Sequence, residues 1–410
     1  MSSKVIGTHS GPFHGDDVMA CAILKLHPDY RDGEVVRSRE KETLDKCDIV
    51  VDVGGRFSHE DRRYDHHQKG FHLTMDQLSD GEINSKTKLS SAGLVFYYYG
   101  KEVIRDTLHR LELDGEKDII KIDWIWKRIY FGLIKEIDAI DNGLQRQLPG
   151  SNLIKTGYSS KVGRLNPSWE EENPDFNKSF NKALELATGE LIDILKDQES
   201  VFKAKMVVSL ILNVLEIKKH HKSGRVLIFQ DYVPWSSVLT EVEREAGMEG
   251  HILFVVNPSP ESGGFHLKAV HERIKLLDEW GALEGEELQR VTGVKGAKFV
   301  HDNLHLAVTD TVEAAISLVD LVLERGQLSR QLTLDCVRQE MEKIRLDDQL
   351  REQRVKEKKT AGPVWRPGGG AWRERERARA ESGGGRDTEG ERRSDRDPDR
   401  RKYGRPSGRV

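Results

Sequence analysis

Asp48-Ile49-Val50-Val51-Asp52-Val53-Gly54-Gly55 is the stretch that decides the fold. Its β-branched centre is typical of a buried parallel strand, and the two glycines follow where the chain must turn with little side-chain bulk. Residues 4–8 and 34–37 predict two further strands, and residues 17–26 have the apolar spacing of a helix. Strands that alternate with helices predict an α/β fold, with a parallel sheet flanked by helices.

The remainder of the chain predicts a second, smaller α/β domain. We place a metal-binding catalytic domain at 1–150, a linker at 151–175 and the second domain, which would position the substrate, at 176–327. Within these limits the pattern predicts a loop at 142–174, helices at 90–99, 119–140, 176–216 and 311–324, and strands at 225–230, 252–257 and 264–270. A charged helix at 328–360 and a disordered, Arg-rich tail at 361–410 complete the prediction, because the tail has too few apolar residues to form a core.

Composition narrows the class of protein. The chain has 410 residues and a net charge of −4, yet residues 351–410 carry 19 Lys and Arg against 11 Asp and Glu, so the body is acidic and the tail basic. The three cysteines show no paired spacing, which favours a reducing compartment. No apolar run approaches the ~20 residues that span a bilayer, so we expect no membrane partner. The basic tail indicates either a solvated linker or weak RNA binding and nuclear import.

Histidines and carboxylates gather at the ends of the predicted strands and helices. Imidazole and carboxylate ligands without cysteine disfavour a structural zinc site and suit Mn²⁺ or Mg²⁺, and the histidines favour Mn²⁺. The groups suffice for two ions, with Asp52 as the best bridging carboxylate because it ends a buried strand. Two such ions can activate a shared water and neutralise charge on phosphorus, which predicts phosphoester hydrolysis. The candidates are His9, His14, Asp16, Asp17, Asp52, Asp65, His66, His67, Asp138 and Asp141.

These motifs resemble those of the Myg family (melanocyte proliferating gene family) within the DHH phosphoesterase superfamily. The resemblance covers about residues 4–325 and is dense before residue 170. It is carried by Gly7-Thr8-His9, Phe13-His14, Val51-Asp52-Val53-Gly54-Gly55, Arg63-Tyr64-Asp65-His66-His67-Gln68, Lys88-Leu89-Ser90-Ser91-Ala92-Gly93, Asp138-Ala139-Ile140-Asp141-Asn142-Gly143, Arg164-Leu165-Asn166-Pro167 and Phe299-Val300-His301.

The resemblance implies a role for each residue of the site. His9, Asp16 and Asp52 would bind one ion, and His14, Asp52, His66 and Asp141 the other. His67 would contact the scissile phosphate and Asp65 would orient a neighbouring histidine. Asp17 and Asp138 would support the ligands, although either Asp138 or Asp141 fits the ligand position. The resemblance also implies a 3′–5′ exoribonuclease that releases nucleoside monophosphates, located in the nucleus or cytoplasm, with the mitochondrion a further family location. A first strand near residue 5 leaves little room for a transit peptide.

Cations and aromatic residues near the motifs are candidates for substrate binding. Arg37, Arg63, Lys88, Arg164 and His301 could hold phosphates, and for each arginine and lysine a surface ion pair is an equal alternative. Trp169, Trp235 and Tyr158 could stack on bases, although lone aromatic residues more often belong to a core.

Two other functions fit the same sequence. One is a phosphatase or pyrophosphatase for a small substrate, since the metal core would be the same. The other is a non-catalytic RNA-binding protein that keeps the motifs for stability. Nothing in the sequence fixes the oligomeric state.

Overall fold

The computed structural model describes residues 3–113, 119–144, 156–212, 214–259, 263–270, 274–325 and 345. The chain divides into two units, Met1–Gln327 and Leu328–Val410. The predicted charged helix and tail, 328–410, lie outside the described residues except for Arg345. No helix in the described ranges is both long and apolar enough to cross a membrane.

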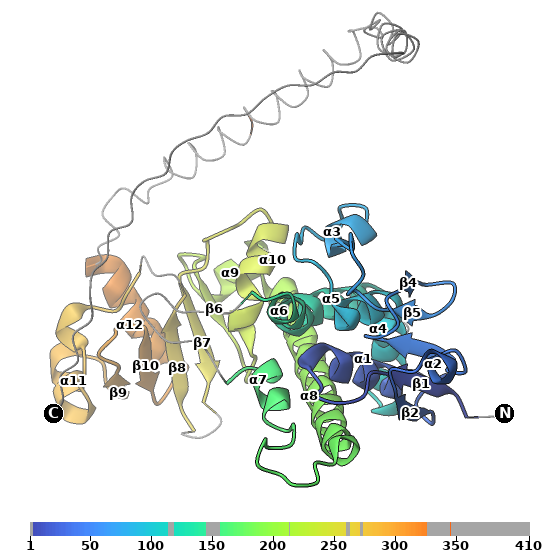
Figure 1. Cartoon of the computed structure of the whole chain (residues 1–410). Coiled ribbons are helices and arrows are strands. Elements are labelled where there is room, and N and C mark those ends of the chain that lie inside the picture. Colours follow the sequence, from blue (N-terminus) through green and yellow to red (C-terminus); the bar gives the residue numbers. More distant parts are fainter. Residues whose placement is uncertain are drawn as a thin grey trace, which may run out of the picture. The chain divides into compact units, whose positions relative to one another are not determined.

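The first five-stranded sheet has the order β2-β1-β3-β5-β4 (Figure 1, blue). Strands β2, β1, β3 and β5 are parallel, and β4 runs antiparallel to β5 at the edge. The predicted parallel sheet is therefore confirmed, with a short antiparallel strand added. Its strands are β1 Val5–Thr8, β2 Glu34–Arg37, β3 Ile49–Val51, β4 Phe57–Ser58 and β5 Arg63–Tyr64.

Helices around this sheet include three that the sequence pattern missed: the short α2 and α3, and α7, which lies in the predicted loop. The others begin near the predicted positions, but α4 continues to Arg110, well beyond the predicted end at 99, and the 119–140 segment contains a π-helical turn. They are α1 Gly15–Leu26, α2 Lys41–Leu44, α3 Met75–Leu78, α4 Ser91–Arg110, α5 Ile119–Ile129, the π-helix Tyr130–Ile134, α6 Lys135–Asp141 and α7 Tyr158–Gly163.

The second five-stranded sheet has the order β6-β7-β8-β10-β9 (Figure 1, yellow to orange). Only β6 and β7 pair in parallel; β7-β8, β8-β10 and β10-β9 are antiparallel. The predicted helix 176–216 is wrong at its end, because α8 stops at Ile211 and α9 begins at Val214. The remaining elements are α8 Phe176–Ile211, α9 Val214–His220, β6 Val226–Ile228, the 3-10 turn Trp235–Ser237, α10 Leu239–Glu245, β7 Phe254–Pro258, β8 Phe265–Ala269, the 3-10 turn Asp278–Trp280, α11 Gly285–Thr292, β9 Ala297–Val300, β10 Leu306–Thr309 and α12 Val312–Arg325.

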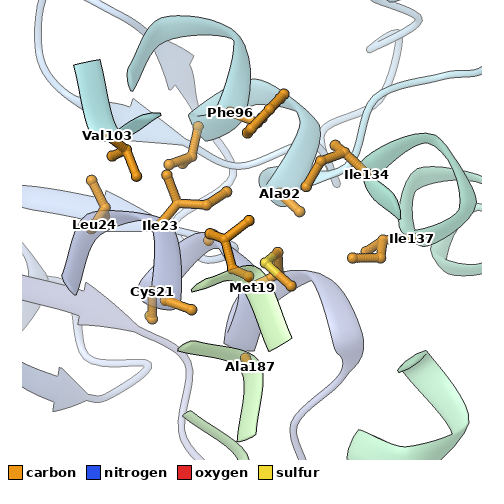
Figure 2. Packing of buried hydrophobic residues seen from close by; sticks show 14 of the residues in the cluster. Met19, Cys21, Ile23, Leu24, Ala92, Phe96, Val103, Ile134, Ile137 and Ala187 are labelled. Carbon is orange, nitrogen blue, oxygen red and sulfur yellow. The ribbon is translucent and has the colours of Figure 1, made fainter. Parts of the chain in front are cut away.

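The main core forms around α1. This helix is buried on nearly every side, which explains its run of small and apolar residues. Figure 2 shows Met19 and Ile23 of α1 among Ala92 and Phe96 of α4, with Ala187 of α8 nearby. A rigid, buried α1 matters for the site because the residues at its N-terminus are candidate metal ligands.

Helix α8 contributes to two hydrophobic cores. Its first half supplies Phe180 and Leu195 to the core around α1, whereas its second half supplies Val201 and Val208 to the core beside β6 and β7. The domain boundaries at 150, 175 and 327 stay predictions, and the helix that starts at 176 packs in both parts.

Candidate metal centre

Asp52 is placed at the centre of the site by its backbone. It follows β3 directly and has a φ of 59°, a left-handed conformation that aspartate tolerates better than most residues. Gly54 and Gly55 continue the turn with positive φ angles. The conformation leaves the buried carboxylate facing two imidazoles: Oδ2 lies 3.4 Å from His9 Nε2, and Oδ1 lies 3.3 Å from His66 Nε2.

The loop between β1 and α1 supplies a second group of candidate ligands. His9 follows β1, and its Nε2 also lies 3.1 Å from Asp17 Oδ2. The backbone N–H of His14 donates to Asp17 Oδ1 at 2.7 Å, which caps α1 and fixes the loop. Asp16 is fully buried, and among the described residues neither of its carboxylate oxygens has a hydrogen-bond partner.

Asp141 completes the cluster from the end of α6. Its Oδ2 lies 3.1 Å from His66 Nε2, and Asp16 Oδ2 lies 3.6 Å from the same nitrogen. Asp138 instead accepts hydrogen bonds from the backbone N–H and the hydroxyl of Ser90, at 2.9 and 2.7 Å. This arrangement favours Asp141 as the ligand and Asp138 as a support for the start of α4.

Burial and charge set the protonation of these groups. Burial alone would lower the pKa of His9 and His66, but the close carboxylates of Asp17 and Asp52 (for His9) and of Asp141 and Asp52 (for His66) outweigh it and raise each pKa to about 9. Burial together with the charges of Asp52 and Asp141 raises the pKa of Asp16 well above its usual value. Burial would also raise the pKa of Asp52, but His66 and His9 hold it below its usual value. Buried carboxylates so close together require positive charge among them.

The donor set fits divalent metal ions. Oxygens and ring nitrogens that lie within 4.8 Å of one another form four overlapping groups: His9 with His14 and Asp52, Asp52 with His66 and His67, His14 with Asp16 and Asp141, and Asp16 with Asp17 and Asp52. Several of these buried atoms make no well-aligned hydrogen bond within the described part of the chain, namely both oxygens of Asp16, Oδ2 of Asp17 and both ring nitrogens of His66. Orphaned buried donor atoms of this kind are expected at an ion site. Asp52 belongs to three of the four groups, which suits a bridging ligand.

His67 differs from His9 and His66, which are buried, because its side chain is 60% exposed. Its Nδ1 lies 2.7 Å from Asp65 Oδ1, and this hydrogen bond raises the pKa of the ring. Asp65 is in turn fixed by the backbone N–H groups of Gly55 and His67. His67 is therefore oriented by Asp65 and presents its other edge outward.

The predicted substrate-binding cations have different surroundings. Arg37 donates to the carbonyls of Gly11 and Phe176, and Arg63 donates to the carbonyls of Leu44 and Cys47, so both guanidinium groups fasten loops. Lys88 lies over the ring of Phe71, whose centroid is 6.4 Å from that of His66.

The last two predicted substrate-binding residues are more distant in the chain. Arg164 is exposed at the end of α7. His301 follows β9 in the second sheet and pairs with Asp302. Substrate binding by all five residues stays a prediction.

Three residues make contacts in the site that the sequence did not predict, although Arg39 was a further candidate for holding phosphates and Ser91 and Asn166 lie in the motifs of the resemblance. Ser91 donates its hydroxyl to Asp52 Oδ1 at 2.9 Å, and Arg39 Nη2 lies 3.2 Å from His9 Nδ1. Asn166 binds the backbone N–H and carbonyl of Phe13, at 3.0 and 2.9 Å. All three contacts join distant segments, so the sequence indicates these residues but not their partners.

Comparison with known proteins gives a consistent result. The model of an uncharacterised protein family, UPF0160 (MYG1_exonuc), matches residues 5–323. "MYG1 exonuclease" of Bos taurus is 34% identical over 334 residues, which are 79% of this chain and 85% of the relative. "MYG1 protein" of Dictyostelium discoideum is 35% identical over 342 residues (80% and 98%), and "MYG1 exonuclease" of Homo sapiens is 33% identical over 344 residues (81% and 89%).

A solved structure also matches, weakly. It is RecJ in complex with Mn²⁺ from Thermus thermophilus, with a TM-score of 0.21 and 14% identity, covering 79% of this chain and 52% of that one. A score that low does not establish a common fold.

Proposed function

The chain belongs to the MYG1 exonuclease family, UPF0160, and from that premise we propose that it is a metal-dependent 3′–5′ exoribonuclease. It would hydrolyse the terminal phosphodiester and release nucleoside monophosphates. Relatives in cattle and human carry the name MYG1 exonuclease, which supports nuclease chemistry. RNA as the substrate, the polarity, a nuclear or cytoplasmic location and the mitochondrion as a further one are our proposals from the family resemblance.

The observation that carries the proposal is the arrangement around Asp52. A buried carboxylate faces His9 with one oxygen and His66 with the other, and further carboxylates surround the pair. We propose that His9, Asp16 and Asp52 hold one divalent ion, and that His14, Asp52, His66 and Asp141 hold a second. Mn²⁺ suits this mixture better than Mg²⁺ because imidazole contributes. The ions would activate water and offset negative charge on the phosphate.

The chain's own residues do the remaining work. His67, whose ring is oriented and whose pKa is raised by its hydrogen bond to Asp65, can donate to a phosphate oxygen. Ser91 fixes the rotamer of Asp52 by donating to Oδ1. Asp17 orients His9 while it caps α1, so the loop that carries the ligands is held at both ends.

The test is a parallel incubation with Mn²⁺ of three substrates: end-labelled RNA, end-labelled DNA and pyrophosphate. The proposal expects loss of single nucleotides from the 3′ end of RNA. Cleavage of pyrophosphate alone would instead favour the small-substrate phosphatase, and binding of RNA without cleavage would favour the non-catalytic protein.

The decisive variant is Asp52→Asn. Asparagine has the same size and tolerates the left-handed backbone, so the fold should survive while the bridging charge is lost. We expect activity to fall by at least about 10³-fold, which is the scale for loss of a group that positions charge. Asp45→Asn, at an exposed position after α2, is the matched control. Undiminished cleavage by Asp52→Asn would rule out metal-bridged catalysis here.

A further inference from the structure

Trp169 is unusually exposed for so large an apolar side chain. Its relative exposure is 90%, whereas Trp126, Trp235 and Trp280 are buried and Trp124 packs against Phe202 at a ring-centroid distance of 5.4 Å. Leaving so large an apolar ring in water forgoes the gain that burial would bring. Tyr158 and Trp235, the other aromatic candidates for base stacking, are buried.

The turn that carries Trp169 is well fixed. The backbone N–H of Glu171 donates to the carbonyl of Ser168 at 3.1 Å, and the Glu171 carboxylate accepts from the N–H of Ser168 at 2.9 Å. The N–H of Glu170 also donates to the Ser168 hydroxyl at 3.3 Å. Trp169 therefore stands at the tip of a turn closed by both main-chain and side-chain bonds. Because the turn is already ordered, it loses little conformational entropy when it binds a partner.

The same segment is tied to the metal centre. Asn166, three residues before Trp169, makes two hydrogen bonds to the backbone of Phe13, and Phe13 precedes His14. Three residues span at most about 11 Å, so Trp169 lies within about 20 Å of the His14 backbone when the side chain of Asn166 is included. A single strand of several nucleotides is long enough to cover that distance.

We propose that Trp169 is a stacking platform for a nucleobase of single-stranded RNA, a few nucleotides from the scissile phosphate. Stacking of a base on an aromatic ring does not depend on which base is present, which suits an enzyme that removes nucleotides from RNA one after another. Glu170, Glu171 and Glu172 are exposed carboxylates that repel phosphates, so RNA would have to bind this turn through a base on the Trp169 ring rather than through its backbone. This proposal rests on the proposed exoribonuclease function for its substrate.

The test measures binding apart from hydrolysis. A fluorescein-labelled, hydrolysis-resistant phosphorothioate RNA of about ten nucleotides is titrated with full-length protein and Mn²⁺, and anisotropy gives Kd. We expect Trp169→Ala to weaken binding about 5- to 100-fold, and Trp169→Phe, which keeps a stacking ring, to retain most of the affinity. Tyr232→Ala, which removes another exposed aromatic ring outside this turn, is the control and should bind like the unaltered protein.

Each outcome separates the two proposals. Unchanged affinity in Trp169→Ala, or an equal loss in Trp169→Phe, overturns the platform, as does a failure of the unaltered protein to bind the RNA. If the unaltered protein hydrolyses ordinary RNA and Trp169→Ala binds RNA with unchanged affinity, the exoribonuclease proposal is supported and the stacking proposal is wrong. That result would point to a protein partner for this turn. If RNA affinity depends on the Trp169 ring but RNA is not hydrolysed, the stacking proposal is supported and the exoribonuclease proposal is wrong.

Discussion

Gly93→Ala tests whether the buried carboxyl of Asp138 sets the geometry of the site. A Cβ on Gly93 would overlap Asp138 Oδ1 and lie only 2.6 Å from Oδ2. The Asp138 side chain cannot rotate into solvent, because it is fully buried and accepts hydrogen bonds from the N–H and the hydroxyl of Ser90. The added methyl group must therefore displace the carboxyl or move the start of α4.

The expected cost follows from three contributions. Overpacking costs about 1–3 kcal/mol. Loss of the Ser90 hydrogen bonds in a buried site costs about 1–3 kcal/mol more. Alanine gains about 1 kcal/mol over glycine as a helix former. The net loss in free energy of unfolding is about 1–5 kcal/mol.

The assay is urea unfolding of the metal-free protein, followed by Mn²⁺ titration. Gly189→Ala is the matched control, since Gly189 is an exposed position in α8 where an added Cβ meets nothing within 4 Å. It should gain up to about 1 kcal/mol. Displacing Ser90 also disturbs Ser91 and its bond to Asp52, so Mn²⁺ affinity should fall in Gly93→Ala and not in the control. Two alanine variants of equal stability would refute this account of Asp138.

Two further predictions concern protons. Because the pKa of His9 and His66 is raised to about 9, both rings are charged at pH 7 and must lose a proton to bind metal. Mn²⁺ binding should therefore release at least two protons, to which Asp16 can add because its pKa is raised as well, and the two histidines should tighten binding by up to about 100-fold per pH unit from 7 to 8.5. Calorimetry in buffers of different ionisation enthalpy counts the protons, and affinity that is flat with pH would contradict the assignment. Burial, opposed by hydrogen bonds from Ser90, raises the pKa of Asp138 to about 7. The pKa of the same group in the unfolded chain is about 3.9. The contribution of Asp138 to stability is therefore fully present below about pH 4 and is lost as pH rises through 7, a change of roughly 4 kcal/mol. Asp138→Asn keeps an amide oxygen that can accept from Ser90, so it should gain stability over the unaltered protein at pH 8 and gain less at pH 5. Urea unfolding without metal measures both gains. An equal gain at the two pH values would disprove the raised pKa of Asp138.

The sequence predicted the elements whose pattern is local. Residues 34–37 form β2 as expected, and the helix predicted at 17–26 begins two residues earlier in the structure, at Gly15. Strands β4 and β5 were missed because two residues are too few to show alternation. Helix α7 was missed within a segment rich in glycine and asparagine, where no local rule favours a helix.

The candidate ligands could be predicted because histidine and aspartate at strand and helix ends are visible in the sequence. What holds them in place could not, since it depends on contacts between distant segments. Asn166 binds a residue 153 positions away, and Ser91 binds Asp52 across 39. Nothing near Arg37 in the sequence indicates that its guanidinium group would fasten Gly11 to the start of α8.

The sharing of α8 between two cores bears on how the chain folds during synthesis. Every candidate metal ligand has been synthesised once residue 141 has left the ribosome. The core around α1, however, also needs residues of α8 from Phe180 to Leu195. For the time needed to add those further residues, the nascent chain would carry a complete set of ligands on an incomplete core. Metal capture would thus have to wait for a helix that contributes none of the ligands.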